Sequence, residues 1–511
     1  MTKETGHTMT EKTGHTMTEK TGHTMKEALV YEISAPGRCG LKMPEPDVPF
    51  ASLPGGMVRD DLPLPELAQI DVVRHYLRLS QFNYGVDKGF YPLGSCTMKY
   101  NPKVNEEAAR IPGLAFTHPL QAPQTTQGNL AIMWALQEFL KSISGFAAVT
   151  LQPAAGAHGE FTGILIIRAY HLSHGDAKRT KILIPDSAHG TNPASTAMAG
   201  YTTVTIPSDA RGNVDLGALR ANCDDTVAAI MITNPNTLGL FDEHIEEVID
   251  MVHDCGGLVY GDGANLNALL GIVRPADLGF DVMHFNLHKT FSTPHGGGGP
   301  GSGPVGVTEE LAQFLPGPLV VIDDAAIEDE TVPLFDLVMP EHSVGRVKAF
   351  WGNFGMLVRA YTYIRVHGPE GLRRIAEHAV LNANYLQARL KGTYPIPHGD
   401  RICMHEFVAQ GIVEGSDVRA LDIAKRLIDY DFHPPTNYFP LIVHEALMIE
   451  PTETESKQTL DAFAEAMIKI AQEAKESPQL LHDAPHVAPT RRLDEVRAAK
   501  QLVLCATFPQ D

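Results

Sequence analysis

Short apolar runs alternate with helical patterns between residues 130 and 307, and this alternation restricts the fold more than any other feature. Helical periodicity is clearest over Leu130–Ile143, Gly159–Leu172 and Glu243–His253. The runs typical of strands are Lys181–Pro185, Thr202–Ile206, Val227–Thr233, Leu258–Gly261, Val282–Phe285 and Pro304–Val307. Strands that alternate with helices form mainly parallel sheets covered on both faces, so the sequence predicts an α/β fold of this kind.

Polar residues stand where these predicted strands end. They are Asp186, Thr233 with Asn234, Asp262, and the segment from Asn286 to Lys289. Ligands of parallel sheets bind beyond the carboxyl ends of the strands, so we expect these residues to meet at one site. Among them, Thr233 and Asn234 are candidates for contact with the ligand.

Lys289 and Asp262 are the two residues that a pyridoxal 5'-phosphate site needs. A lysine at a strand end can form a Schiff base with the cofactor aldehyde, and an aspartate can keep the ring nitrogen protonated. Each of the two closes an apolar run, where an unpaired charge would be costly to bury. The alternative is that both are ordinary surface loop residues. We predict that both are catalytic and bind the cofactor.

Two glycine-rich segments need separate interpretation. Gln152–Gly159 precedes a predicted helix, and its small residues Ala155, Gly156 and Ala157 would let backbone N–H groups approach a phosphate; a simple tight turn is the alternative. The second segment, His295–Gly303, lacks the Lys of a nucleotide P-loop. It is either a mobile loop beside the lysine, such as a lid, or a spacer without function.

The histidines near the predicted site have different candidate roles. His189 follows a predicted strand, so its ring is the favoured group for stacking on the cofactor and for handling protons, with His158 as the second candidate. His284 and His288 have a spacing that places both on one face only in a helix, and their surroundings are strand-like. No metal site is therefore expected.

Overall composition excludes several classes of partner. The 511 residues carry a formal net charge of −20, which disfavours nucleic acid and anionic membranes. The six cysteines are scattered without a C-x-x-C pair, as in a reduced cytoplasmic protein. Inert buried thiols are the default for Cys96 and Cys255.

Four regions are expected along the chain. Residues 1–27 contain three near copies of an octad and are predicted to be a disordered tail. Residues 28–128 are an arm or interface segment with a helix over Glu66–Ser80, and residues 129–356 form the large ligand-binding domain. Residues 357–511 form a smaller α+β domain. Its predicted elements are helices over Gly371–Lys391, Leu460–Lys475 and Arg491–Gln501 and a strand over Phe439–Val443.

Long motifs in the chain resemble the glycine dehydrogenase (decarboxylating), or P protein, family of the glycine cleavage system. Within that family the likeness is to catalytic subunit 2 of the two-subunit form, and it runs from about Pro36 to Lys500. The motifs that carry it are Tyr91–Pro102, Leu151–Glu160, Asn286–Phe291 with the glycine-rich loop, and Glu450–Lys457. A shorter likeness to other pyridoxal phosphate decarboxylases covers Ala188–His189, Asp262 with Ala264, and His288–Lys289.

The resemblance implies a fold of the pyridoxal-phosphate-dependent transferase superfamily, fold type I. It implies that Lys289, preceded by His288, carries the cofactor, that Asp262 and Ala264 meet the ring nitrogen, and that His189 stacks on the ring. The reaction implied is decarboxylation of glycine, with transfer of the aminomethyl group to the lipoyl arm of the H protein. The group that anchors the glycine carboxylate is left open among Ser95, Thr97, Lys99 and Arg346.

The family also occurs as a single chain about twice this length, and this sequence matches only its lysine-bearing half. The resemblance therefore implies a separate subunit 1, an α2β2 assembly and a lipoylated H protein as partners. Two alternatives remain: another fold-type-I decarboxylase or aminotransferase, and a non-catalytic assembly subunit. The presence of Lys289 together with Asp262 argues against the second.

Overall fold

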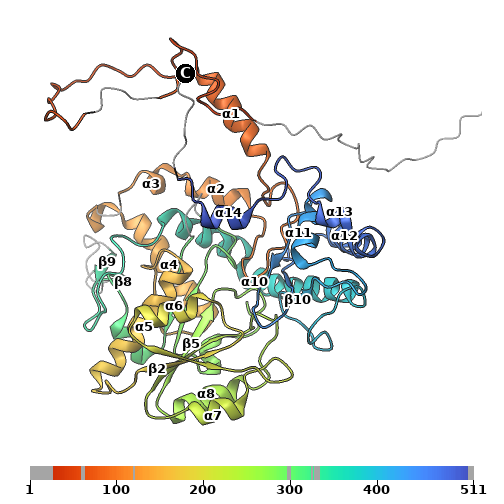
Figure 1. Cartoon of the computed structure of the whole chain (residues 1–511). Coiled ribbons are helices and arrows are strands. Elements are labelled where there is room, and N and C mark those ends of the chain that lie inside the picture. Colours follow the sequence, from red (N-terminus) through yellow and green to blue (C-terminus); the bar gives the residue numbers. More distant parts are fainter. Residues whose placement is uncertain are drawn as a thin grey trace, which may run out of the picture. The chain divides into compact units, whose positions relative to one another are not determined.

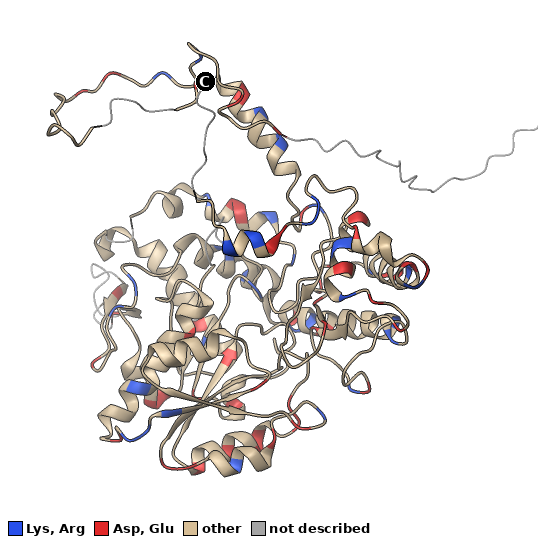
Figure 2. Cartoon of the chain, in the orientation of Figure 1, with Lys and Arg blue, Asp and Glu red and all other residues tan. Residues whose placement is uncertain are grey.

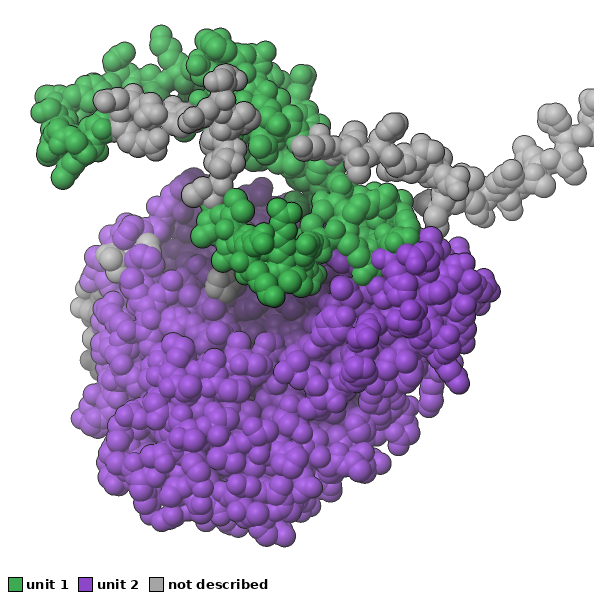
Figure 3. All heavy atoms as spheres, viewed as in Figure 1, with its two compact units in different colours: residues 1–83, 483–511 green, residues 84–482 purple. Residues whose placement is uncertain are grey.

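The computed structural model describes residues 27–58, 64–118, 121–295, 301–323, 326 and 334–504. The chain forms two compact units, residues 1–83 with 483–511 and residues 84–482 (Figure 3). The octad repeat and residues 296–300 of the glycine-rich loop lie outside the described ranges, so the predicted tail and lid are not tested.

The first unit contains helices α1 (Gln69–Gln81) and α14 (Glu495–Lys500). Helix α1 begins three residues later than predicted because the backbone of Ala68 is still extended. Glu27 accepts a hydrogen bond from Arg78 at 2.7 Å and lies 3.0 Å from the ring of His75 on this helix. Asp494 caps α14 by accepting from the Arg497 N–H group. Both predicted helices are therefore confirmed, with shorter bounds.

A seven-stranded sheet organises the second unit, with strand order β1-β7-β6-β5-β4-β2-β3 (Figure 1). The strands are β1 (Ala148–Thr150), β2 (Lys181–Pro185), β3 (Thr202–Ile206), β4 (Val227–Thr233), β5 (Leu258–Gly263), β6 (Val282–Phe285) and β7 (Val305–Val307). Strands β2 to β6 are parallel, whereas β7 is antiparallel to both β6 and β1. The mainly parallel sheet is confirmed, and strand β1 is an addition that the sequence did not indicate.

Helices cover both faces of this sheet because successive strand residues point to opposite sides. In β4, Ile230 belongs to the core that includes helices α4 (Gln127–Ser144) and α8 (Ile245–Asp254). Its neighbour Met231 belongs instead to the core that includes helix α5 (Gly156–Ser173). Figure 2 shows the central strands mostly without charge, which agrees with a sheet buried on both faces.

Smaller elements complete the large lobe around the sheet. They are α2 (Lys103–Ala109), α3 (Pro112–Ala115), η1 (Pro123–Thr125), α6 (Thr191–Met198), α7 (Leu216–Asn222), η2 (Pro275–Leu278), η3 (Glu309–Phe314), β8 (Leu319–Ile322) and β9 (Phe335–Val338). Strands β8 and β9 pair with each other as an antiparallel ribbon.

The small lobe has its own core and a three-stranded antiparallel sheet in the order β10-β12-β11. Its elements are β10 (Phe407–Gln410), β11 (Thr436–Asn437), β12 (Ala446–Ile449), α11 (Ala420–Asp429), α12 (Lys457–Glu476) and α13 (Pro478–His482). The predicted strand over Phe439–Val443 is wrong. This segment turns between β11 and β12, and Pro440 has no N–H group to donate to a strand ladder.

Helix α10 (Phe354–Leu390) connects the two lobes of the second unit. It is broken at Gly368, which has a φ of 61°, followed by Pro369. Before the break, Ala360 packs in the core of the large lobe, and near the end Leu386 packs in that of the small lobe. The predicted helix Gly371–Lys391 is the second part of α10, and the domain limits proposed from the sequence stay a prediction.

Across the described ranges, none of the helices combines the length and the apolar composition that a membrane span requires.

Candidate active site

Lys289 lies in a turn directly after strand β6 and is only 8% exposed. Its Nζ atom donates a hydrogen bond of 2.6 Å to the backbone oxygen of Ser95. Ser95 has a φ of 64° and lies in an extended segment whose residue Leu93 bridges to Ile449 of β12. The lysine is thus held at the carboxyl edge of the large sheet by a segment that also touches the small lobe.

Asp262 lies inside strand β5 rather than after it, and is 5% exposed. Its carboxylate accepts a 3.1 Å hydrogen bond from the Ala264 N–H group and a 3.5 Å bond from Asn192. In the sheet register, Asp262 is paired with Thr233 of β4. Burial raises the pKa of Asp262, but the adjacent His284, the charge of Lys289 and the Ala264 N–H group outweigh it and keep the pKa below its usual range. A buried carboxylate therefore faces the lysine.

A buried tyrosine and histidine stand behind this carboxylate. The hydroxyl of Tyr260 lies 2.7 Å from Nδ1 of His284, whose Nε2 is 3.6 Å from Asp262. Burial lowers the pKa of His284 to about 4, so the ring is neutral at pH 7. A neutral ring carries one proton, and because the ionised Asp262 can only accept, we assign that proton to Nε2, which faces Asp262, and the Tyr260 hydroxyl then donates to Nδ1. The sequence pattern had given His284 no role.

Glu160, in the first turns of α5, is a second buried acid near Asp262. It accepts hydrogen bonds from Thr191 at 2.8 Å and from Ser195 at 3.3 Å. Burial and then the charge of Asp262 raise its pKa to about 7. This group can therefore change its protonation near neutral pH.

The two histidine candidates lie in different electrostatic surroundings. His189 is half-buried, and burial lowers the pKa of its ring. The charge of Asp262 raises this pKa and the charge of Lys289 lowers it. The ring of His158 accepts a 3.1 Å hydrogen bond from the Ala154 N–H group, and the charge that acts on it is that of Lys348. Of the two rings, His189 is thus the one grouped with the lysine and the aspartate.

His288 is turned toward the glycine-rich loop. Its Nδ1 accepts a 3.3 Å hydrogen bond from the Ser302 N–H group, and its ring lies edge-on to that of His295. Burial lowers the pKa of His288 to about 3, so it is neutral. This histidine anchors the described end of the loop.

The predicted phosphate cradle lies at the N-terminus of α5, beside the lysine turn. Helix α5 begins at Gly156, has an extended N-cap residue in Ala155, and has no side-chain cap. A Cβ atom at Gly156 would lie 2.6 Å from Oδ1 of Asn286, and one at Gly303 would lie 2.0 Å from the oxygen of Ala155. Ala157 follows and is exposed. An 18-residue helix thus presents uncapped N–H groups close to the lysine turn.

Buried polar atoms without hydrogen-bond partners gather at this edge of the sheet. Among the described residues they include Asn192 Oδ1, Thr233 Oγ1, Asn234 Nδ2, His284 Nε2, Asn286 Oδ1 and Ser302 Oγ. Buried polar groups are normally satisfied, so such a concentration indicates the binding place of a polar ligand. A buried lysine, a buried aspartate and an uncapped helix fit the aldehyde, ring nitrogen and phosphate of pyridoxal phosphate.

A buried acidic pair near Lys289 escaped the analysis of the sequence. Glu406 precedes β10 and Glu450 follows β12, and both are almost fully buried. With His405 they place potential ligand atoms within 4.8 Å of one another. No local pattern indicates this group, because the residues are brought together only by strand pairing in the small lobe.

The proposed carboxylate anchors occupy different positions. Thr97 donates to Glu450 at 2.6 Å, and Lys99 forms a buried ion pair of 2.9 Å with Glu453. Arg346 is exposed, and Ser95 contacts the lysine through its backbone.

Other polar groups considered in the sequence have local roles. Asp186 accepts a 3.1 Å hydrogen bond from the Ser208 N–H group. Burial raises the pKa of Cys96. A hydrogen bond with Cys223 lowers the pKa of Cys255 to about 6.

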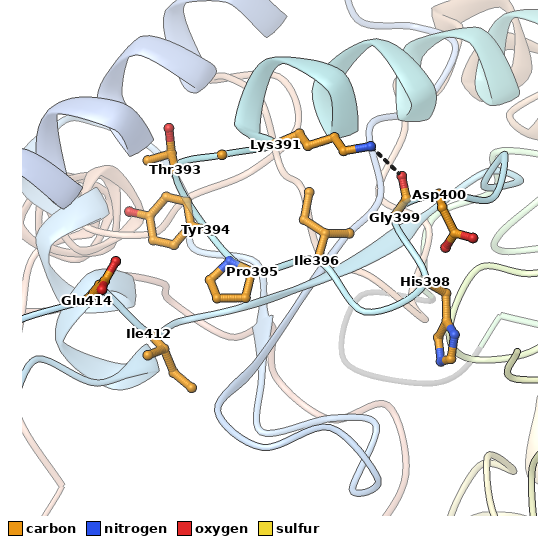
Figure 4. A pocket seen from close by; sticks show the side chains of 11 residues that line it. Lys391, Thr393, Tyr394, Pro395, Ile396, His398, Gly399, Asp400, Ile412 and Glu414 are labelled. Carbon is orange, nitrogen blue, oxygen red and sulfur yellow. Dashed lines mark hydrogen bonds between the residues drawn. The ribbon is translucent and has the colours of Figure 1, made fainter. Parts of the chain in front are cut away.

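A separate hollow of about 720 Å³ lies in the small lobe after helix α10 (Figure 4). Tyr394, Ile396 and Glu414 are among its lining residues, and Lys391 donates a 3.1 Å hydrogen bond to the Gly399 oxygen at its rim. None of the residues predicted to bind the cofactor lines it.

Comparison with families shows two matching regions. Residues 375–486 match the C-terminal domain of glycine dehydrogenase, and residues 163–299 match the class-V aminotransferases. A protein of Caldanaerobacter subterraneus subsp. tengcongensis is 58% identical over 484 residues, which cover 93% of this chain and 98% of that protein. One of Shouchella clausii is 56% identical, over 93% of this chain and 97% of that protein. Both are named probable glycine dehydrogenase (decarboxylating) subunit 2.

Solved structures share the fold at lower identity. The glycine decarboxylase (P-protein) of the glycine cleavage system, in inhibitor-bound form, aligns with a TM-score of 0.67 and 21% identity. The alignment covers 82% of this chain and 93% of that structure. A glutamate decarboxylase of Lactobacillus brevis aligns with a TM-score of 0.62 and 12% identity, over 84% of this chain and 96% of that structure. The fold type expected from the sequence is confirmed.

Proposed function

Because the chain belongs to the glycine dehydrogenase (decarboxylating) subunit 2 family, we propose that it binds pyridoxal phosphate and decarboxylates glycine. The aminomethyl group that remains is transferred to the lipoyl disulfide of an H protein. The observation that carries the proposal is the buried Lys289 amine within electrostatic reach of the buried Asp262, in a chain closely related to subunit 2 over nearly its whole length.

Each part of the cofactor has a proposed partner among these residues. Lys289 would bind the aldehyde, and Asp262, supported by the Ala264 N–H group, would pair with the ring nitrogen. The uncapped helix start at Ala155, Gly156 and Ala157 would take the phosphate. His189 would contact the ring face. The remaining contacts would come from Thr233 and Asn234, whose side chains have polar atoms without hydrogen-bond partners, and from His288.

Pyridoxal phosphate, when bound, supplies an electron-withdrawing ring that accepts the electron pair left by departing carbon dioxide. The residues of the chain set the conditions for that step. The low pKa of Asp262 keeps it ionised, so it favours a protonated ring nitrogen. The burial of Lys289 and Asp262 keeps water away and strengthens their electrostatic interaction.

The partners proposed are a subunit 1 in an α2β2 assembly and a lipoylated H protein, in the cytoplasm. The name subunit 2, carried by the relatives, supports a partner subunit. Exposed apolar side chains in the first unit also support one, including Leu41, Met43 and Phe50. Large exposed apolar patches commonly mark contacts with another protein. The net charge of −20 supports the absence of nucleic acid and anionic membrane among the partners.

The test compares the visible absorbance of the chain mixed with pyridoxal phosphate, for wild type and Lys289→Ala. Wild type should develop a yellow band, borohydride should fix the cofactor on the peptide that contains Lys289, and glycine should shift the band. Lys178→Ala, at an exposed lysine paired with Asp225, is the control and should keep the band. A band of equal strength in Lys289→Ala would remove the proposed role of this lysine.

The activity is then measured with subunit 1 and lipoylated H protein added. Wild type should release the carboxyl carbon of glycine as carbon dioxide, and release should depend on the lipoyl group. Carbon dioxide released from larger amino acids, or nitrogen transfer to an oxo acid, would favour the alternative enzyme class instead.

A further inference from the structure

The buried acidic pair Glu406 and Glu450 takes no part in the function derived so far. The two side chains are 4% and 1% exposed, and together with His405 their polar atoms lie within 4.8 Å of one another. Both carboxyl groups feel the charge of Lys289. They therefore form one electrostatic unit with the amine that we assign to the cofactor.

The two carboxyl groups are unequally supplied with hydrogen-bond donors. Oε1 of Glu450 accepts from Thr97 at 2.6 Å, Asn265 at 3.0 Å and Asn267 at 3.1 Å. Glu406 accepts from the Ser95 N–H group at 2.8 Å. Burial raises the pKa of both groups, but three donors oppose this at Glu450, whereas a single donor leaves Glu406 better suited to keep a proton.

The charges in this pocket also favour a retained proton. Two ionised carboxylates next to the single ammonium of Lys289 would leave a net negative charge in a buried place, which is costly. His405 does not offset this negative charge, because burial lowers the pKa of its ring to about 3 and the ring is neutral at pH 7. Neither ring nitrogen has a hydrogen-bond partner among the described residues. One proton on the pair removes one of these buried negative charges.

We propose that Glu406 and Glu450 share one proton, and that this pair supplies, through Lys289, the proton consumed when the aminomethyl group is transferred. The inference rests on the proposed function and extends it. Ser95 connects the groups, because its oxygen accepts from Lys289 and its N–H group donates to Glu406. The glutamates are thus positioning residues that act through the lysine amine.

The transfer step requires a proton to balance. The bond between the glycine α-carbon and its carboxyl group breaks, and the electron pair forms the new carbon–sulfur bond. The sulfur–sulfur bond of the lipoyl group breaks, and its pair goes to the second sulfur, which leaves as a thiolate and needs one proton. The Lys289 ammonium gives that proton, and the glutamate pair replaces it. Solvent then restores the proton of the pair.

The groups that face the pair set the pH range over which it keeps its proton. Lys289, His405 and the thiol of Cys96 face it, and each belongs to a different segment packed around it. Burial, and then the charge of Glu450, raise the pKa of Glu406 to about 8. A proton donor needs its protonated form, so transfer should slow as the pH rises through that value.

The first test is infrared difference spectroscopy on the full chain with pyridoxal phosphate bound, assembled with its partner subunit. Glu160, with a pKa of about 7, also carries a buried carboxyl proton at pH 7, so both chains are compared in a Glu160→Gln background. The chain with Glu406 intact should show the carbonyl band of a protonated buried carboxyl group at pH 7, and the added change Glu406→Gln should remove it. The matched control is Glu445→Gln. Glu445 is also buried, and it also accepts a backbone hydrogen bond of 2.8 Å, from Ala420. This control should keep the band.

The second test separates the two halves of the reaction. Glu406→Gln should slow lipoyl-dependent transfer about 100-fold, a typical contribution of positioned proton transfer. The same variant should slow the exchange of labelled bicarbonate into glycine far less than it slows transfer, because that exchange consumes no proton. Wild-type transfer should lose rate above pH 8, whereas the residual rate of the variant should not follow this pH dependence.

Any of three results would overturn the inference while the proposed function stands. The first is an enzyme that releases carbon dioxide but lacks the infrared band that depends on Glu406. The second is a wild type that holds one tightly bound metal ion per chain, since a cation would keep both carboxylates ionised. The third is Glu406→Gln with the transfer rate and pH profile of wild type. A wild type that releases no carbon dioxide at all would instead refute the proposed function, and the proton supply with it.

Discussion

The hydroxyl of Tyr260 is the group behind Asp262 whose removal is the most informative. The substitution Tyr260→Phe deletes the 2.7 Å hydrogen bond to His284, and both side chains are completely buried. Without that donor, Nδ1 of the neutral ring is left unpaired, and the ring proton can move away from the nitrogen that faces Asp262. The variant should therefore lose both stability and support for the aspartate.

Both losses can be estimated from the contacts. A buried acceptor left without its donor costs about 1–3 kcal/mol of the free energy of unfolding. If the substitution raises the pKa of Asp262 by about one unit, the ionised aspartate is less favoured. A cofactor whose protonated ring nitrogen pairs with that aspartate should then bind about tenfold more weakly. The control is Tyr394→Phe, which deletes a buried 2.8 Å hydrogen bond to the Met467 oxygen in the small lobe.

Guanidinium unfolding of the cofactor-free chain measures the first loss, and absorbance titration with pyridoxal phosphate measures the second. Both variants should unfold at lower denaturant concentration, but only Tyr260→Phe should raise the dissociation constant. If Tyr260→Phe binds the cofactor as tightly as wild type, or if Tyr394→Phe weakens binding equally, the role assigned to the Tyr260–His284 contact is refuted.

Two further predictions concern the acid and the helix start near Asp262. Because the pKa of Glu160 is raised to about 7 on folding, its protonated form stabilises the folded chain below pH 4.5, and this stabilisation is lost as the pH rises to 7. The free energy of unfolding of wild type relative to Glu160→Gln should therefore fall by about 2–3 kcal/mol between pH 4.5 and 8, and parallel pH curves would contradict this. Gly303→Ala places a Cβ atom 2.0 Å from the Ala155 oxygen, so it should displace the start of α5 and weaken cofactor binding. Gly190→Ala, where a Cβ meets no atom within 4 Å, should bind normally, and equal binding by both variants would argue against the cradle.

Strands β2 to β7 of the large lobe could be predicted because they are short runs of apolar or β-branched residues, whereas β1, β8 and β9 were not indicated. Strand β4, for example, is buried along nearly its whole length and keeps its predicted bounds. Segment Phe439–Val443 was assigned wrongly because the burial of its side chains, such as Phe439 against Leu238, comes from packing between lobes. Apolar composition alone does not distinguish such a turn from a strand.

The same limit applies to the site. Lys289 and Asp262 could be singled out because each closes an apolar run, and in the structure both are buried and the charge of Lys289 acts on Asp262. The neutral ring of His284 and the pair Glu406 and Glu450 could not be found in this way. Their importance depends on strand register and on contacts between distant segments, which local patterns do not contain. The roles of the individual cofactor-binding residues stay predictions.

The hydrogen bond between Lys289 and Ser95 has a consequence for how the protein is made. The ribosome releases a chain from its N-terminus, so residue 95 emerges long before the lysine, and Glu450 emerges long after it. The segment around Ser95 is positioned by β12, which ends at Ile449. The surroundings of the lysine are therefore a late product of synthesis, and a nascent chain that stops before β12 carries Lys289 without Glu450 and without the strand that positions Ser95.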